Sequence, residues 1–201
     1  LKPPELIGML GDSRPAVRRR AVEMLGKAGA EAAGDMIEAV QRSRSMDVRR
    51  NVIWASARID APETRAVART ALSDGDASVR QTAAAVVSLT RDAEALPQLT
   101  ALVLCEFPFD RRIAAEAMGR IGDPSAVPTI LKALENVTAD DRFLHHALTF
   151  ALIQIADPQA TAPALDSSEP RVRRAGLMAI DQMDGGGLDP HKTAALLADP
   201  D

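Results

Sequence analysis

The sequence predicts an all-α fold, a solenoid of about six stacked helix pairs followed by one unpaired helix. A short pattern recurs about every 31 residues, each period holds two helical stretches, and the composition favours helices. The 201 residues include 37 alanines, against one Trp, four Phe and no Tyr. Alanine has the highest helix propensity of the amino acids. We therefore expect residues 1–201 to form one repeat domain.

The repeat is anchored by an apolar residue followed by Arg, with a small residue four positions after the apolar one. Successive anchors are separated by 31, 31, 31, 33 and 29 residues. Two copies depart from the pattern, because Asp110 replaces the apolar residue and the fifth arginine has moved to Arg142. The six anchors are Val17, Val48, Val79, Asp110, Phe143 and Val172.

Each period contains a helix that begins near the anchor, here called the anchor helix. From the anchor, apolar or small residues recur at +4, +7, +8 and +11, as in the run from Val17 to Ala28. This spacing predicts a buried stripe about four turns long. The small residues at +4, among them Ala21, Ala83, Ala114 and Ala147, are expected where helices approach closely.

A second helix, here called the first helix, precedes each anchor helix. Asp123-Pro124, Asp157-Pro158 and Asp189-Pro190 each combine an N-cap carboxylate with proline at the first helical position. The later prolines in Leu96-Pro97 and Val127-Pro128 are expected to weaken one hydrogen bond without ending the helix.

Helix pairs of this length stack on their neighbours to bury their stripes, and neither the tetratricopeptide nor the ankyrin signature is present. Residues 17–26 and 123–134 resemble the HEAT-like repeats of phycobilisome (PBS) lyases. This resemblance implies a right-handed α-α superhelix, with the anchor helices lining its concave face.

A narrower resemblance concerns residues 142–157 and 179–188, which are similar to planctomycete membrane-bound-dehydrogenase-like or haem-binding multidomain proteins. That resemblance implies a fragment of a larger polypeptide in the periplasm or cell envelope. The haem motif CxxCH of that family is absent from the 201 residues, so no cofactor is expected here.

The charge balance, 24 Lys plus Arg against 28 Asp plus Glu, argues against a dedicated nucleic-acid-binding domain. One cysteine excludes a disulfide scaffold and a Cys-rich metal site. Without an apolar run of roughly 18 residues or a signal peptide, we expect no membrane insertion and no targeting signal in this segment.

No catalytic or metal-binding residues are predicted. Cys105 lies in an apolar run and is expected to be a small buried hydrophobe. His145 and His146 point about 100° apart on a helix, and pairing His145 with Asp141 supplies only two metal ligands. Gly185–Gly187 follows an anchor helix and is expected to form a turn, because a phosphate-binding loop would follow a strand.

Two columns of basic residues follow the anchors. We call the residues one position after the anchors the +1 column, and expect their arginines to form a structural ladder with acidic residues of neighbouring repeats. The residues two positions after the anchors, the +2 column, should face solvent. The +2 column comprises Arg19, Arg50, Gln81, Arg112, His145 and Arg174.

Trp54 belongs to the +6 column, on the same side of the anchor helix as Arg50. It either joins Arg50 in an exposed contact site or fills a gap between repeats. The predicted partner-binding residues of the concave face are Arg19, Arg50, Trp54, Arg112, His145 and Arg174.

The sequence thus predicts a non-catalytic scaffold that binds an acidic protein surface or a neighbouring domain. Chromophore handling, as in PBS lyases, and nucleic-acid binding along the arginines are the alternatives. Compensating acidic residues are expected on the opposite layer, at Glu31, Asp35, Glu38, Glu63 and Glu94. The ends, residues 1–10 and 193–201, lack polar caps, which predicts exposed apolar stripes and self-association.

Overall fold

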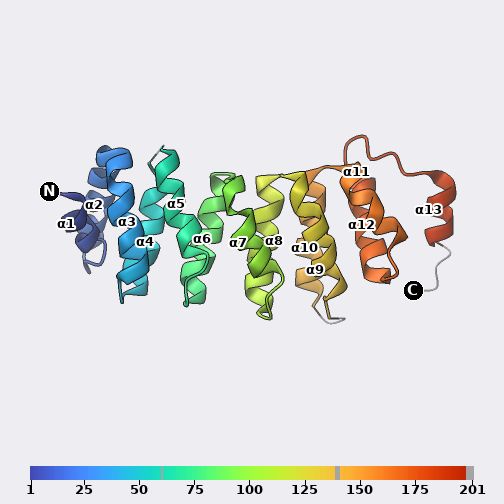
Figure 1. Ribbon diagram of the computed structural model, residues 1–201, viewed down its shortest axis with the longest axis horizontal. Helices are drawn as coiled ribbons and strands as arrows, with labels where there is room; N and C mark the ends of the chain where they lie inside the picture. Colours follow the sequence, from blue (N-terminus) through green and yellow to red (C-terminus); the bar gives the residue numbers. More distant parts are fainter. Residues whose placement is uncertain (60, 139–140, 198–201) are drawn as a thin grey trace. The chain divides into compact units, whose positions relative to one another are not determined.

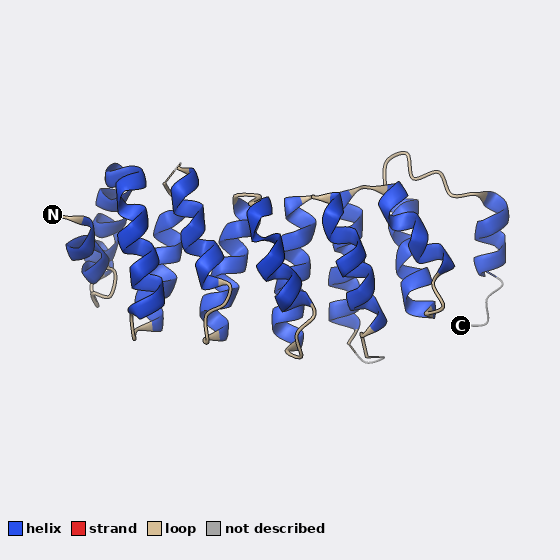
Figure 2. Ribbon diagram, viewed as in Figure 1, coloured by secondary structure: helices blue, strands red, loops and turns tan. Residues whose placement is uncertain are grey.

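The computed structural model describes residues 1–59, 61–138 and 141–197, and these residues form helices joined by turns (Figure 2). No strand occurs among them. The chain divides into two compact units, Leu1–Gln98 and Leu99–Asp201, which are described separately. None of the described helices is long and apolar enough to cross a membrane.

The first unit contains two layers of helices (Figure 1). The anchor helix α4 packs against α2 and α6, and the first helix α3 packs against α1 and α5. Its elements are α1 (Pro3–Met9), α2 (Pro15–Ala28), the 3-10 turn η1 (Gly29–Ala32), α3 (Ala33–Arg42), α4 (Met46–Ser56), α5 (Pro62–Ala71), α6 (Ala77–Leu89) and η2 (Ala93–Ala95).

The second unit repeats this arrangement. The boundary between the units falls within α7 (Leu96–Val103), and the anchor helix α10 packs against both α8 and α12. Its other elements are α8 (Pro108–Ile121), η3 (Pro124–Ala126), α9 (Val127–Glu135), α10 (Arg142–Ile155), α11 (Pro158–Thr161), η4 (Ala162–Asp166), α12 (Pro170–Gln182) and α13 (Pro190–Leu197). The predicted all-α repeat solenoid is confirmed.

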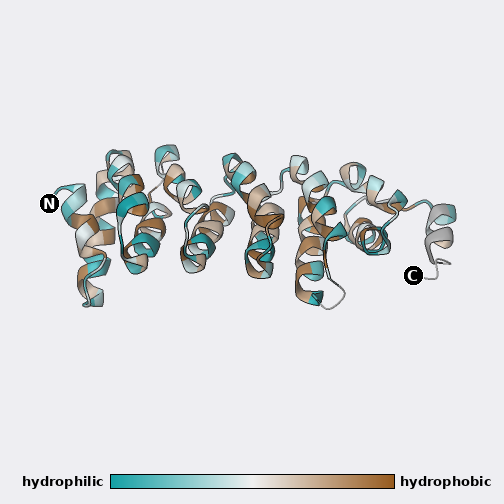
Figure 3. Ribbon diagram, turned by 60° about the horizontal axis from the view of Figure 1, so that its bottom comes forward, coloured by the Kyte–Doolittle hydropathy of each residue, from teal (hydrophilic) through white to brown (hydrophobic). Residues whose placement is uncertain are grey.

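Most helices carry both hydrophobic and hydrophilic residues around their circumference (Figure 3). Most apolar side chains of the predicted stripes are buried, and so are the small residues Ala21, Ala83, Ala114 and Ala147. Val17, Met24 and Ala28 of the first stripe and Val48 of the second are half-buried. The sixth repeat has Gly176 at this place, where a Cβ atom would lie 2.5 Å from the Cβ atom of Ala164. The +4 position of the sixth repeat is therefore a point of close approach.

The register of the fifth repeat differs from the prediction. Five anchors occupy the third position of their helix, but Phe143 is the second residue of α10 and is 75% exposed. Leu144 occupies the third position and is buried. Counting from Leu144 places buried side chains at +4, +7, +8 and +11, whereas counting from Phe143 places the exposed Gln154 at +11. The anchor of this repeat is therefore Leu144.

The helices that contain Leu96-Pro97 and Val127-Pro128 begin differently from the prediction. Each is preceded by a 3-10 turn, and the α-helix starts one residue before the proline. Pro128 has no N–H to donate to the carbonyl of Pro124, so that carbonyl accepts the N–H of Val127 and closes the tighter turn. Asp123-Pro124 consequently opens a 3-10 turn rather than an α-helix.

The predicted caps are present. The carboxylate Oδ1 of Asp157 accepts the N–H of Ala160 at 2.8 Å, and that of Asp189 accepts the N–H of His191 at 2.7 Å. Asp123 accepts the N–H of Ser125 at 2.9 Å, and this bond holds the pKa of Asp123 below its ordinary value. These carboxylates satisfy amides that have no partner within the helix.

The expectation of an exposed apolar stripe at the first ten residues is wrong. Leu6, Ile7 and Leu10 are buried, because α1 packs its apolar side chains against α2 and α3. At the other end, residues 198–201 of the expected stripe lie outside the described residues.

Candidate interaction surface

The +1 arginines fold back onto the chain. In four repeats the guanidinium Nη1 donates to the carbonyl oxygen six residues earlier, at 2.7–3.0 Å. The pairs are Arg18 with Asp12, Arg49 with Ser43, Arg80 with Asp74, and Arg173 with Ser167. These bonds hold the loop before each anchor helix, so the predicted structural role is present with backbone carbonyls as the common partners.

An acidic residue joins this ladder at Arg49. Arg49 forms a two-point ion pair with Asp74 of the next repeat, with Nη2–Oδ1 at 3.1 Å and Nε–Oδ2 at 2.8 Å. Arg111 instead donates to the carbonyl oxygens of Val103, Ala133 and Asn136. The guanidinium groups of the +1 arginines are thus bound to backbone carbonyl oxygens, and that of Arg49 also to Asp74.

In the +2 column Arg19, Gln81 and Arg174 are exposed, whereas Arg50, Arg112 and His145 are half-buried. In the first unit Arg19 is exposed, and Trp54 is 46% exposed. Both residues line a pocket of about 310 Å³, together with Val22 of α2 and Arg58. Arg50 is half-buried and is hydrogen-bonded to Asp47 and to Ser78 Oγ. This pocket places Trp54 with the cations Arg18, Arg19 and Arg58, and the expected Arg50 does not line it.

In the second unit, α8 and α10 present aromatic and cationic side chains around a pocket of about 480 Å³. Arg112, Phe143, His146 and Phe150 all line it. The Arg112 guanidinium carbon lies 5.3 Å from the ring centroid of Phe109, and the rings of His146 and Phe150 are stacked with centroids 6.1 Å apart. With Leu144 as the anchor of the fifth repeat, His146 is its +2 residue and Phe150 its +6 residue. This explains why both side chains lie on the same side of α10 and line the pocket.

All five aromatic residues of the sequence are exposed. The exposed fractions range from 39% for Phe109 to 75% for Phe143, while the core is formed by Leu, Ile, Val, Met and Ala. Of these five aromatic residues, Trp54 alone is predicted from the sequence as a contact residue. The phenylalanines of α10 could have been recognised from the register, because Phe150 falls on the +6 column once Leu144 is the anchor.

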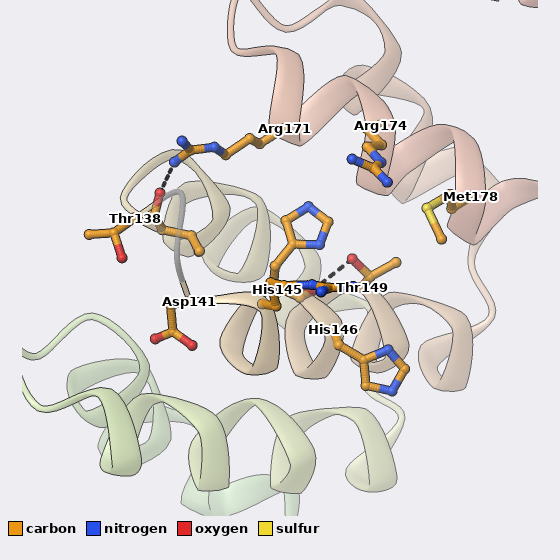
Figure 4. A pocket seen from close by; sticks show the side chains of 10 residues that line it. Thr138, Asp141, His145, His146, Thr149, Arg171, Arg174 and Met178 are labelled. Carbon is orange, nitrogen blue, oxygen red and sulfur yellow. Dashed lines mark hydrogen bonds between the residues drawn. The ribbon is translucent and has the colours of Figure 1, made fainter. Parts of the chain in front are cut away.

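A second pocket of about 340 Å³ lies between α10 and α12 (Figure 4). The His145 ring points from α10 toward the turn of α12 that carries Arg171 and Arg174, whereas His146 points to the other side. Arg171 Nη1 donates to the carbonyl oxygen of Val137, in the segment that precedes α10. Burial lowers the pKa of His145, and the charges of Arg174 and Arg171 lower it further against an opposing hydrogen bond with the Arg171 backbone.

The cations of this unit's anchor-helix face are not neutralised by the chain. Among the described residues, no carboxylate lies within 4.0 Å of a guanidinium nitrogen of Arg112, Arg142, Arg171 or Arg174. The predicted acidic residues Glu38 and Glu94 instead pair with Arg42 and Arg69, which belong to the first helices.

The remaining candidates have structural surroundings. Cys105 is half-buried in the turn after α7, with its Sγ 3.8 Å from the carbonyl oxygen of Phe107, which corrects the expectation of a buried position within a helix. Gly185–Gly187 form the expected turn after α12, and Gly185 has a φ of 74°. Groups of three potential metal ligands are absent from the described residues.

Comparison with known sequences identifies the repeats. The sequence profile of HEAT repeats matches residues 35–106, and that of the PBS lyase HEAT-like repeat matches residues 110–136. No curated protein sequence matches the chain.

Solved structures share the fold. The complex of CpcE and CpcF of phycocyanin lyase from Nostoc sp. PCC7120 is similar with a TM-score of 0.55 and 22% identity, over 90% of this chain and 76% of that chain. A designed armadillo repeat protein in complex with the peptide (KR)4 matches with a TM-score of 0.51 and 14% identity, over 92% of this chain and 100% of that chain.

Human deoxyhypusine hydroxylase in complex with glycerol matches with a TM-score of 0.51 and 18% identity, over 88% of this chain and 68% of that chain. Similarities at these identities concern the fold. The repeat pattern and the paired helices make the chain an all-α repeat solenoid, in which residues 35–106 match HEAT repeats and residues 110–136 match the PBS lyase HEAT-like repeat.

Proposed function

We propose that the chain is a non-catalytic repeat scaffold, and that its anchor-helix face binds an acidic protein partner or an acidic neighbouring domain. The observation that carries this proposal is the exposure of all five aromatic side chains. Around the pocket between α8 and α10, three of them, Phe109, Phe143 and Phe150, lie beside Arg112 or His146. A monomer gains nothing from exposing its large aromatic residues while it builds its core from aliphatic ones.

The chemistry of this face fits a protein partner. Aromatic side chains and arginine are the residue types that contribute most to binding at protein interfaces, because they bury a large area with few rotatable bonds. Arg112 already lies over the Phe109 ring, which orients its guanidinium at the surface. Trp54 with Arg19 offers a similar combination in the first unit.

The charge distribution favours an acidic partner. Arg112, Arg142 and Arg174 have no carboxylate within 4.0 Å among the described residues. Each of the two pockets of the second unit also has one carboxylate in its lining, Glu116 between α8 and α10 and Asp141 between α10 and α12. An acidic surface would supply the missing counter-charges, and the resulting attraction would raise its association rate more than its final affinity.

Chromophore handling is the second candidate function, and the similarity to the CpcE and CpcF complex favours it. The exposed aromatic rings around the 480 Å³ pocket could stack on a conjugated ligand. A change in the absorption spectrum of a bilin on addition of the chain would support this candidate. Loss of that change in Phe150→Ala would locate the ligand in this pocket.

The other predictions from the sequence remain predictions. Nucleic-acid binding along the arginines would show an affinity that falls steeply with salt. Membership of a planctomycete dehydrogenase-like or haem-binding polypeptide, with a cell-envelope location, is supported by residues 142–157 and 179–188 alone.

The proposed function is tested by charge reversal. One variant carries Arg19→Glu, Arg50→Glu and Arg112→Glu on the anchor-helix face. The matched control carries Glu31→Lys, Glu38→Lys and Glu63→Lys, three exposed residues outside the anchor helices. A partner captured by the wild-type chain is purified, and its Kd for each variant is measured by calorimetry.

We expect the arginine variant to lose at least tenfold in affinity, while the control stays within about twofold of the wild type. Both variants must keep the wild-type helical content, which circular dichroism verifies. Equal losses in the two variants, or none in either, would show that the +2 arginines are merely a solvated surface.

A further inference from the structure

The pocket between α10 and α12 has the properties of an anion site. Arg142, His145, Arg171 and Arg174 line it, together with His146, Thr138 and Thr149 (Figure 4). The Thr149 hydroxyl donates to the carbonyl oxygen of His145 at 2.9 Å. We infer that this pocket binds a phosphate monoester, that is, a phosphate dianion carried on a small organic group. The inference deepens the proposed function, because the pocket lies on the anchor-helix face, but it concerns a small group that can be supplied without a protein partner.

The charge of the pocket requires a counter-ion. Its described lining contains one carboxylate, Asp141, whose Oδ1 accepts the N–H of Leu144 at 2.9 Å as the N-cap of α10. Arg142 and Arg174 have no carboxylate within 4.0 Å among the described residues, and Arg171 has only the carbonyl of Val137. Three guanidinium groups around one carboxylate leave a net positive cavity.

A dianion satisfies this set better than a single carboxylate. A guanidinium donates two parallel hydrogen bonds to the oxygens of a carboxylate or a phosphate. One carboxylate carries two oxygens and a single charge, and would leave cations of the pocket without a partner. A phosphate monoester offers three terminal oxygens and close to two negative charges at neutral pH.

The size of the pocket provides room for the group that carries the phosphate. At about 340 Å³ it falls at the lower end of the range for small-ligand sites, roughly 300–1,000 Å³. The side chains of Val137 and Met178 give it apolar surface beside the cations. A phosphorylated side chain or a small alkyl phosphate therefore fits, with the organic part against Val137 and Met178.

His145 connects anion binding to pH. Burial and the charges of Arg174, Arg171 and His146 hold its pKa below the ordinary value, so the ring is neutral in the empty pocket at neutral pH. The charged groups that line the pocket around it are Arg171 and Arg174 of α12, Arg142 of α10 and Asp141 at the N-cap of α10. His146 also lines the pocket, but its ring points to the other side of α10 (Figure 4). Val137 and Thr138, which follow α9, carry no charge. A bound dianion reverses the local potential, which favours protonation of His145.

The first test uses small anions as probes of the 201-residue chain. Sulfate, inorganic phosphate, glycerol phosphate and a phosphoserine peptide are titrated while the His145 ring signals are followed by NMR, with acetate as the carboxylate probe. We expect saturable shifts with the phosphates and sulfate, and an affinity at least tenfold weaker for acetate. Stronger binding of the peptide than of glycerol phosphate would identify a modified protein as the source, and the reverse order a small metabolite.

The second test separates a site from general attraction to a basic surface. Arg174→Gln should weaken sulfate binding at least tenfold, whereas Arg19→Gln, which alters the same column in the other unit, should leave it unchanged. Sulfate remains a dianion between pH 5 and 8, so its affinity for the wild-type chain should rise as the pH falls, and His145→Gln should abolish that rise. Wild-type thermal stability of each variant verifies its folding.

Shifts that grow linearly without saturation would overturn the inference. So would equal affinity for acetate and phosphate, or equal losses in Arg174→Gln and Arg19→Gln. Because no protein partner enters these measurements, their failure would leave the proposed protein-binding function standing. Conversely, failure of the charge-reversal experiment would not affect the anion titration.

Discussion

At the scale of single residues, adjacent arginines have different roles. Arg18 is held by the carbonyl oxygens of Asp12 and Ser13, at 2.7 and 3.0 Å, whereas Arg19 is exposed beside Trp54. One step along an α-helix turns the side chain by about 100°, which takes it from the preceding loop to the solvent. The sequence predicted this division from helical geometry. It did not predict the carbonyl partners, because the path of the loop sets which carbonyls come within reach.

The capping carboxylates provide a prediction with a defined pH dependence. The backbone bond from Ser125 lowers the pKa of Asp123 below the value of about 3.9 expected for the unfolded chain. Stability from this cap is therefore complete above that unfolded value, and is lost as the pH falls through the folded pKa. Asp123→Ala should cost about 1 kcal/mol in the free energy of unfolding at pH 7, the typical cost of losing a cap.

The measurement is urea unfolding of the wild type and Asp123→Ala at pH 7 and below pH 3. The difference between the two proteins should shrink as the pH falls through the folded pKa of Asp123, because protonation of the wild-type carboxylate weakens the cap. Asp123→Asn keeps an acceptor oxygen and should retain most of the stability at both pH values. A difference that does not change with pH would show that the ionised carboxylate is not the stabilising group.

At the scale of helices, the period, the pairing and the caps could be predicted from the sequence, but the register of α10 was missed. Phe143 and Leu144 are both apolar, so either could be an anchor. The residues eleven positions later distinguish them, since Ile155 is buried and Gln154 is exposed. The two pockets of the second unit depend on how neighbouring helices pack, which a pattern within one helix does not determine.

Close approach between elements can be tested at two helical glycines. A Cβ atom on Gly176 of α12 would lie 2.5 Å from the Cβ atom of Ala164, whereas nothing lies within 4 Å of a Cβ atom on Gly26 of α2. Gly176→Ala should therefore destabilise the fold by about 1–3 kcal/mol through overpacking. Gly26→Ala should stabilise it by about 0.5–1 kcal/mol, because alanine favours the helix.

Thermal or urea unfolding of the two variants measures both effects. The two variants should change the free energy of unfolding in opposite directions. The substitution is identical in both, so a difference in sign comes from the surroundings of the glycine. A neutral effect of Gly176→Ala would mean that α12 and η4 separate easily and are not closely packed in solution.

At the scale of the molecule, residues 1–201 are expected to behave as one domain, although they form two compact units. The boundary between Gln98 and Leu99 lies inside α7, so separate unfolding of either unit would break that helix. Trp54 is the single tryptophan and reports on the first unit, whereas circular dichroism reports on the helices of both. We expect urea transitions followed by the two signals to coincide, as they do for a two-state domain.

Transitions with different midpoints would show instead that the two units unfold independently. In that case, each unit would present its own part of the anchor-helix face. Arg19, Arg50 and Trp54 belong to the first unit, and Arg112, His145 and Arg174 belong to the second.

The central claim is that the exposed aromatic and cationic side chains of the anchor helices are the binding surface. Hydroxyl-radical footprinting tests it most directly, because aromatic side chains react readily and all of those in this chain are exposed. Oxidation of Trp54, Phe143 and Phe150 is quantified by mass spectrometry with and without the captured partner. Leu89 and Leu104, which are exposed and lie outside the +2 and +6 columns, serve as internal controls. The account predicts protection of the aromatic residues with unchanged leucines; protection of the leucines while the aromatics stay reactive would contradict it.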